Sequence, residues 1–64
     1  MAISIKAARV NAGFTQTEVA ESVGKTKNTI AAYENYIRKV PIDVALAMAN
    51  LFNMSVDDII WTQE

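Results

Sequence analysis

Two polar residues, Lys27 and Asn28, open a stretch with helical periodicity, and their side chains could read nucleic-acid bases. A lysine ammonium can donate to O6 and N7 of guanine, and an asparagine amide can form paired hydrogen bonds with N6 and N7 of adenine. One turn further along, Ala31 and Ala32 share the outward face, and a small methyl group there could touch the methyl group of thymine. A solvated helix start, with alanine present for its helix propensity, would give the same pattern.

The basic residues of the chain are gathered in its first part. Residues 1–40 hold six Lys or Arg against three Glu, whereas residues 41–64 hold four acidic residues and no base, so the net charge of −1 hides an asymmetry. Such a separation lets the basic part face phosphates while the acidic part faces away. Arg38 and Lys39, in the loop after the helical stretch, could bind phosphate or enter a minor groove, although an ordinary solvated loop is the alternative.

The elements that must position these groups lie between Thr15 and Asn35. Thr15 and Glu18 are spaced as a reciprocal capping box, which predicts a helix over residues 16–23. Gly24 follows, the residue type best suited to the left-handed conformation that ends a helix. Thr26 can cap a second helix, over residues 27–35. The pattern therefore predicts two short helices joined by a tight turn.

Close crossing of these two helices requires a small residue at the contact. Ala20 stands at that point, Gly24 follows four residues later, and the β-branched Ile30 follows after six more. This spacing favours a helix-turn-helix. An ordinary amphipathic helical hairpin is the alternative.

Three segments carry a family resemblance: TQTEVAESVGKTKNTIAAYEN at residues 15–35, IKAARVNAG at 5–13 and PIDVALAMANLFNMSVDDII at 41–60. Together they resemble the phage-repressor and Cro-like (Xre) helix-turn-helix family over about 55 of the 64 residues. The resemblance implies an all-α, compact five-helix bundle formed by a single domain over residues 1–64. It further implies sequence-specific binding of double-stranded DNA by a transcriptional regulator, and a repressor is the first expectation. The 27–35 helix would lie in the major groove of a palindromic operator.

The resemblance also suggests roles for single residues. The base contacts would be Lys27, Asn28, Ala31 and Ala32, and the DNA backbone contacts would be Gln16, Lys25, Thr26, Asn35, Tyr36, Arg38 and Lys39. Arg9 falls on the apolar side of a helix expected over residues 3–12, so it either extends to water or is paired. In the family an arginine at this point pairs with a glutamate late in the recognition helix, and Glu34 stands at the matching place. A plain surface arginine is the alternative.

The sequence departs from the family pattern after Glu34, because Tyr36 and Ile37 stand where the family usually turns with glycine. We expect Asn35 to take the left-handed position there. Tyr36 would then either lie over the sugar-phosphate backbone or cover the core.

The flanking segments predict the remaining packing. Gly13 ends the first helix, and Phe14 is expected to fill the core between the first two helices. A nearly all-apolar helix from Pro41, ended by Asn53, is expected at the centre of the core. Ser55 would cap a short fifth helix. The apolar residues left over are Ile37, Val40, Ile60 and Trp61. They predict a homodimer interface, with pairing only on DNA as an open alternative.

The sequence argues against several classes of protein and of site. The chain has no cysteine or histidine, so we expect no disulfide, metal site or cofactor. Asp57 and Asp58 would point to different faces of a helix start, which argues against an enzyme. Without a signal-like or membrane-spanning apolar run we expect a cytoplasmic protein, and we expect no small-molecule ligand. The alternative function is a protein-interaction module that uses Tyr36, Ile37, Val40 and Trp61 as its partner surface.

Overall fold

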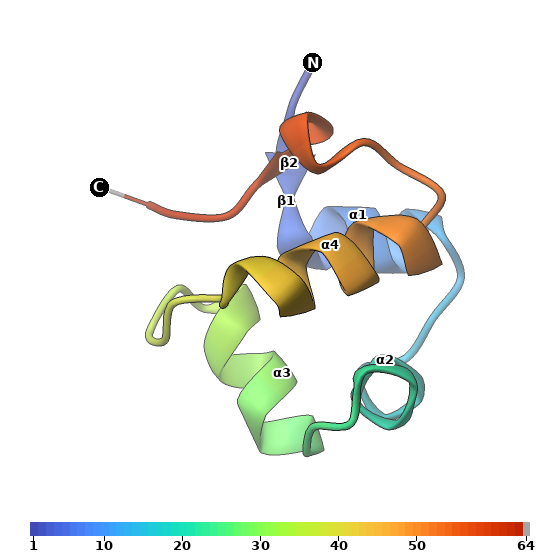
Figure 1. Ribbon diagram of the computed structural model, residues 1–64, viewed down its shortest axis with the longest axis vertical. Helices are drawn as coiled ribbons and strands as arrows, with labels where there is room; N and C mark the ends of the chain where they lie inside the picture. The colour runs from blue at the N-terminus through green and yellow to red at the C-terminus, as the bar shows by residue number, and fades with distance from the viewer. Residues whose placement is uncertain (64) are drawn as a thin grey trace.

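The computed structural model describes residues 1–63, and it contains four α-helices packed around one apolar core (Figure 1). A short strand precedes the first helix, and a 3-10 turn and a second short strand follow the last. The elements in chain order are β1 (Ile3–Ser4), α1 (Ile5–Asn11), α2 (Gln16–Val23), α3 (Lys27–Glu34), α4 (Ile42–Leu51), η1 (Val56–Asp58) and β2 (Ile59–Ile60).

The prediction of five helices is wrong. The segment after Ser55 forms only the three-residue turn η1 and then becomes extended as β2. There Ile59 pairs with Ile3, and Ile60 with Ser4, in a two-stranded parallel sheet. Pairing with the extended start of the chain satisfies backbone groups that a short helix would have left open, and β-branched isoleucines favour it. The fold is therefore mostly helical but not all-α.

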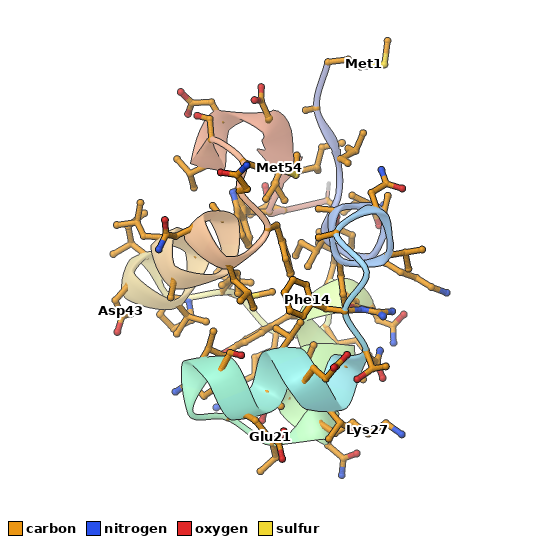
Figure 2. The ribbon with its side chains drawn as sticks, turned by 90° about the vertical axis from the view of Figure 1, so that its right-hand side faces the viewer. Met1, Phe14, Glu21, Lys27, Asp43 and Met54 are labelled. Atoms are coloured by element: carbon orange, nitrogen blue, oxygen red, sulfur yellow. The ribbon has the colours of Figure 1, made fainter. Side chains whose placement is uncertain are left out.

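Because of the same pairing, the first helix starts at Ile5 and not at residue 3 as predicted. Residues 3 and 4 belong to β1, and Ser4 is the N-cap of α1, with its Oγ accepting the Ala7 N–H at 3.0 Å. Gly13 has φ +84°, as expected for a residue that ends a helix. Figure 2 shows Phe14 pointing into the interior between the helices, and its ring centroid lies 6.1 Å from that of Phe52.

The position of α4 differs from the prediction of a helix buried on most sides. Its buried residues are Val44, Ala45, Met48 and Ala49, which form a single stripe. Ile42 and Leu46 lie along one edge of this stripe and are 71% and 53% exposed. A helix in a domain this small packs against neighbours on one side only, so its second apolar stripe stays at the surface. Asn53, with φ +57°, ends the helix as predicted.

Candidate nucleic-acid interface

The amino-terminal end of α2 is capped by its own side chains and has backbone amides without an intrahelical partner. Thr15 Oγ1 accepts the Glu18 N–H at 3.1 Å, and Glu18 Oε1 accepts the Thr15 N–H at 2.8 Å, so the predicted capping box is confirmed. The first intrahelical hydrogen bond is made by the Val19 N–H to the Thr15 carbonyl at 3.1 Å. The amides of Gln16 and Thr17 therefore precede the hydrogen-bonded ladder, at the positive end of the helix dipole.

The turn between α2 and α3 has the predicted geometry. Gly24 adopts φ +71° and donates its N–H to the Ala20 carbonyl, and the Lys25 N–H bonds the same carbonyl at 2.9 Å. Thr26 then caps α3 by accepting the Thr29 N–H at 3.3 Å. Because Ala20 is buried at 3% exposure, the two helices cross closely at this small side chain.

The first turn of α3 projects from the molecule. Lys25, Thr26, Lys27 and Asn28 are exposed, whereas Ala31 and Ala32, one turn later, are half-buried. Figure 2 places Lys27 at the lower end of the molecule, beside α2. This end carries long polar side chains at its tip and short methyl groups behind them.

The end of α3 is held by a polar cluster formed by Arg9, Gln16 and Glu34. Arg9 Nε lies 2.6 Å from Glu34 Oε2 and Nη2 lies 3.3 Å from Oε1, a two-pronged contact. Arg9 Nη1 also donates to the Phe14 carbonyl at 2.8 Å. The side chain of Glu34 is only 3% exposed and that of Arg9 is 11% exposed. The structure thus joins α1, α2 and α3 at one point.

Gln16 belongs to this cluster in a way the sequence did not indicate. Its Nε2 donates to Glu34 Oε1 at 3.0 Å, so the amide group expected at the DNA backbone is turned toward the end of α3. Thr17, next in the chain, is also exposed. The sequence pattern assigned it no role, because an isolated threonine in a first helical turn has no distinctive spacing.

The loop after α3 takes a path that the sequence did not predict. Asn35 does not take the left-handed position; it has φ −89° and its N–H bonds the Ala31 carbonyl at 3.0 Å, so it continues the helix. Tyr36 takes the left-handed conformation instead, with φ +58°. Asparagine is the residue that favours this region locally, so tertiary contacts of the tyrosine ring decide the outcome. The ring packs against the core rather than projecting freely.

The hydroxyl group of Tyr36 is engaged on both sides. It donates to the Ile60 carbonyl at 2.8 Å and accepts the backbone N–H of Ile5 at 3.4 Å. Arg38 and Lys39 follow it and are exposed. They line a shallow pocket of about 220 Å³ together with Tyr36, Ile37, Trp61, Thr62 and Gln63.

The matching family model is described as helix-turn-helix, and it covers residues 5–59. This chain belongs to the helix-turn-helix family. Two relatives from Bacillus subtilis (strain 168) match it over 60 residues, 94% of the chain. The HTH-type transcriptional regulator ImmR is 37% identical, and the chain spans about half of it, 47% of its length. The uncharacterized HTH-type transcriptional regulator YgzD is 32% identical and is spanned over 91% of its length. No solved structure matches the chain.

Within this helix-turn-helix protein, the four residues expected at a dimer interface divide into two pairs. Ile37 is 80% exposed and Ile60 is 41% exposed. Val40 and Trp61 are half-buried and pack against the core, and Trp61 Nε1 donates to the Val56 carbonyl at 2.9 Å. The idea that all four exceed what the monomer can use is therefore wrong for Val40 and Trp61.

The described residues of this helix-turn-helix protein contain no group of three or more His, Cys, Asp or Glu that could hold a metal ion. Across residues 1–63, no helix is long and apolar enough to cross a membrane. The acidic turn η1 lies at the top of the long axis in Figure 1, whereas the start of α3 lies at the bottom.

Proposed function

We propose that this chain binds double-stranded DNA sequence-specifically as a transcriptional regulator that represses by occupying an operator in the cytoplasm. The observation that carries the proposal is the projecting first turn of α3, set at a fixed angle by the Gly24 turn and anchored at its far end through Glu34. A helix presented in this way fits the major groove with its amino-terminal residues toward the bases. The regulator names of the two relatives support the same assignment.

Base reading is assigned to the exposed tip of α3. Lys27 would donate to guanine, and Asn28 would form paired hydrogen bonds with adenine. Ala31 and Ala32, being short and half-buried, would let the helix approach closely and would contact thymine methyl groups. Each good paired contact is worth about 1 to 3 kcal/mol of discrimination against a wrong base.

Phosphate contacts would flank the reading helix on both sides. Lys25 and Thr26 stand before it, Arg38 and Lys39 stand after it, and all four are exposed. The open amides at the start of α2 add a third anchoring point. Asn35 is exposed at the end of α3 and can reach the backbone, whereas the engaged hydroxyl of Tyr36 makes a direct phosphate contact by that residue less favourable.

The proposal is tested by selecting binding sites from random duplexes and then measuring affinity by mobility shift at several salt concentrations. Lys27→Ala and Asn28→Ala should each cost about 1 to 3 kcal/mol on the best site and relax its sequence. Lys39→Ala should weaken all sequences alike and make the salt slope shallower by about one unit. Lys6→Ala, which removes an exposed charge from α1, is the control.

An unchanged site preference after both α3 substitutions would show that α3 is not the reader. Absence of any selected duplex would favour the protein-interaction module. That alternative has lost part of its basis, since Tyr36, Val40 and Trp61 pack against the core and leave mainly Ile37 exposed.

We also propose that two copies bind together on an inverted repeat with half-site centres about one helical turn, roughly 34 Å, apart. One short recognition helix offers few base contacts, and a two-fold axis doubles them. The exposed Ile37 and Ile60 beside the loop pocket are the residues available for the contact between copies. A surface this small fits a protein that is largely monomeric alone and pairs on DNA.

The proposed dimer is tested by measuring how cooperatively the protein binds a duplex with two half-sites. Ile37→Glu combined with Ile60→Glu should abolish cooperative binding to a two-half-site duplex while circular dichroism stays unchanged. Ile42→Glu combined with Leu46→Glu is the matched control, because it adds the same charge to another exposed apolar surface. Equal occupancy of a single half-site and the full repeat by the unaltered protein would contradict the proposed dimer. Loss of cooperativity in the control variant alone would place the contact between copies on α4.

A further inference from the structure

Tyr36 occupies a backbone conformation that its residue type rarely adopts. Apart from glycine, only Tyr36 and Asn53 have positive φ among residues 1–63, and asparagine accepts that region far better than an aromatic residue does. A tyrosine held there requires compensating contacts elsewhere. Those contacts are made by its ring and its hydroxyl group.

The hydroxyl sits where the small parallel sheet comes to an end. The pairing of Ser4 with Ile60 is the last of the sheet, because α1 begins at Ile5 and turns its backbone away. The Ile60 carbonyl and the Ile5 N–H both lie at this end of the sheet. The Tyr36 hydroxyl lies between them, donating to the first at 2.8 Å and accepting from the second at 3.4 Å. It therefore adds a side-chain contact to a backbone group of each segment at the end of the sheet.

The residues on either side of this link form the two walls of one pocket. The basic loop, residues 37–39, forms one wall, and the segment 61–63 that continues from β2 forms the other. The loop itself is tied to α3 by the Ile37 N–H, which bonds the Ala32 carbonyl at 3.0 Å, and by the longer Arg38 contact to the same oxygen at 3.4 Å. The Tyr36 N–H also bonds the Tyr33 carbonyl at 3.1 Å, so these backbone bonds all tie the loop to α3. The Tyr36 hydroxyl links the start of the loop to the sheet.

We propose that Tyr36 is a positioning residue that holds the basic loop in place for phosphate contact by fastening it to the β1–β2 sheet, so that docking of β2 and affinity for DNA are coupled. The coupling rests on the DNA-binding function proposed above. A coupling of binding equilibria is reciprocal, so DNA bound at the loop must also tighten β2 on β1. The sheet lies at the end of the molecule away from the start of α3 (Figure 1), where DNA would not shield it directly.

Tyr36→Phe isolates the hydroxyl, because phenylalanine keeps the ring and has the same backbone preference. In the free protein, amide hydrogen exchange at Ile5, Ile37 and Arg38 should become about threefold faster or more. Affinity should fall by roughly three- to tenfold, in line with the loss of one or two net hydrogen bonds. The fall should be equal for specific and random duplexes, and the salt slope should become shallower.

Tyr33→Phe is the matched control, since Tyr33 is a core tyrosine on α3 for which the structure shows no hydroxyl bond to the sheet. It should leave both the loop exchange and the salt slope unchanged. A purely structural role of Tyr36 would lower the melting temperature without changing the salt slope, so the slope separates positioning from stability. The reciprocal effect is slower exchange of the Ile60 amide on adding a duplex with a single half-site, on which no second copy binds; it should be present in the unaltered protein and lost in Tyr36→Phe.

Unchanged loop exchange in Tyr36→Phe would overturn the proposal, as would a loss of affinity confined to the specific site. If the unaltered protein bound no duplex at all, the DNA-binding function and the coupling would both fail. The exchange rates of the free protein would still report separately whether the hydroxyl holds the loop.

Discussion

Removing Arg9 tests how the carboxyl end of α3 is held. Arg9→Ala deletes both contacts to Glu34 and leaves a carboxylate that is 3% exposed with only the Gln16 amide as a partner. Loss of one partner from a buried pair costs about 3 to 5 kcal/mol. At about 0.05 to 0.15 kcal/mol per residue, a chain of 64 residues has roughly 3 to 10 kcal/mol in total. The variant should therefore be close to unfolding at room temperature.

The opposite substitution should cost less. Glu34→Ala leaves Arg9 with its hydrogen bond to the Phe14 carbonyl, and its side chain is 11% exposed, so the guanidinium can move toward water. We expect a loss of about 2 to 3 kcal/mol. The double variant should lose at least about 1 kcal/mol less than the sum of the two single losses, because each single variant leaves a partner behind.

Urea unfolding followed by circular dichroism measures these free energies. Lys6→Ala, on the exposed side of the same helix, is the control and should stay within about 0.5 kcal/mol of the unaltered protein. Losses under about half a kcal/mol for both single variants would make the pair an ordinary surface ion pair. A larger loss for Glu34→Ala than for Arg9→Ala would refute the reasoning from unequal burial.

Four further variants test the elements around the candidate interface, each by its free energy of unfolding in urea. Thr15→Ala removes the capping box and should cost about 1 kcal/mol; no loss would mean that the cap is dispensable. Gly24→Ala meets no atom within 4 Å, so any loss, expected at about 1 kcal/mol, would come from the left-handed backbone alone. Met48→Ala should cost about 2 to 5 kcal/mol and Leu46→Ala much less, because their side chains are 0% and 53% exposed; equal losses would contradict the register of α4.

Local signals were enough to predict the helix-turn-helix itself. The capping box of Thr15, the left-handed Gly24 and the cap at Thr26 each satisfy backbone groups within a few residues, so their spacing is visible in the sequence. The predicted ranges for α2 and α3 agree with the structure to within one residue. The partnership of Arg9 with Glu34 depends on residues 25 apart, and the family resemblance rather than any local signal suggested it.

Long-range pairing was not predictable in the same way. Each strand of the β1–β2 sheet is two residues long, too short for any alternation of apolar and polar residues, and the paired segments lie at opposite ends of the sequence. The prediction that α4 is buried on most sides was wrong for another reason. When nearly every position of a helix is apolar, periodicity cannot show which stripe faces the core.

The choice of Tyr36 over Asn35 for the left-handed position shows how these two kinds of information combine at the interface. Local preference favours asparagine, yet the hydroxyl of Tyr36 reaches the end of the β1–β2 sheet, a contact that exists only once the sheet has formed. The carboxyl end of α3 is thus fastened twice, through Glu34 to α1 and α2 and through Tyr36 to the sheet. Its amino-terminal turn is exposed and is held by the Thr26 cap and the Gly24 turn. An element held at its far end and exposed at its first turn presents the side chains of Lys27 and Asn28 in a fixed direction, and the proposed reading of a DNA sequence requires such a direction.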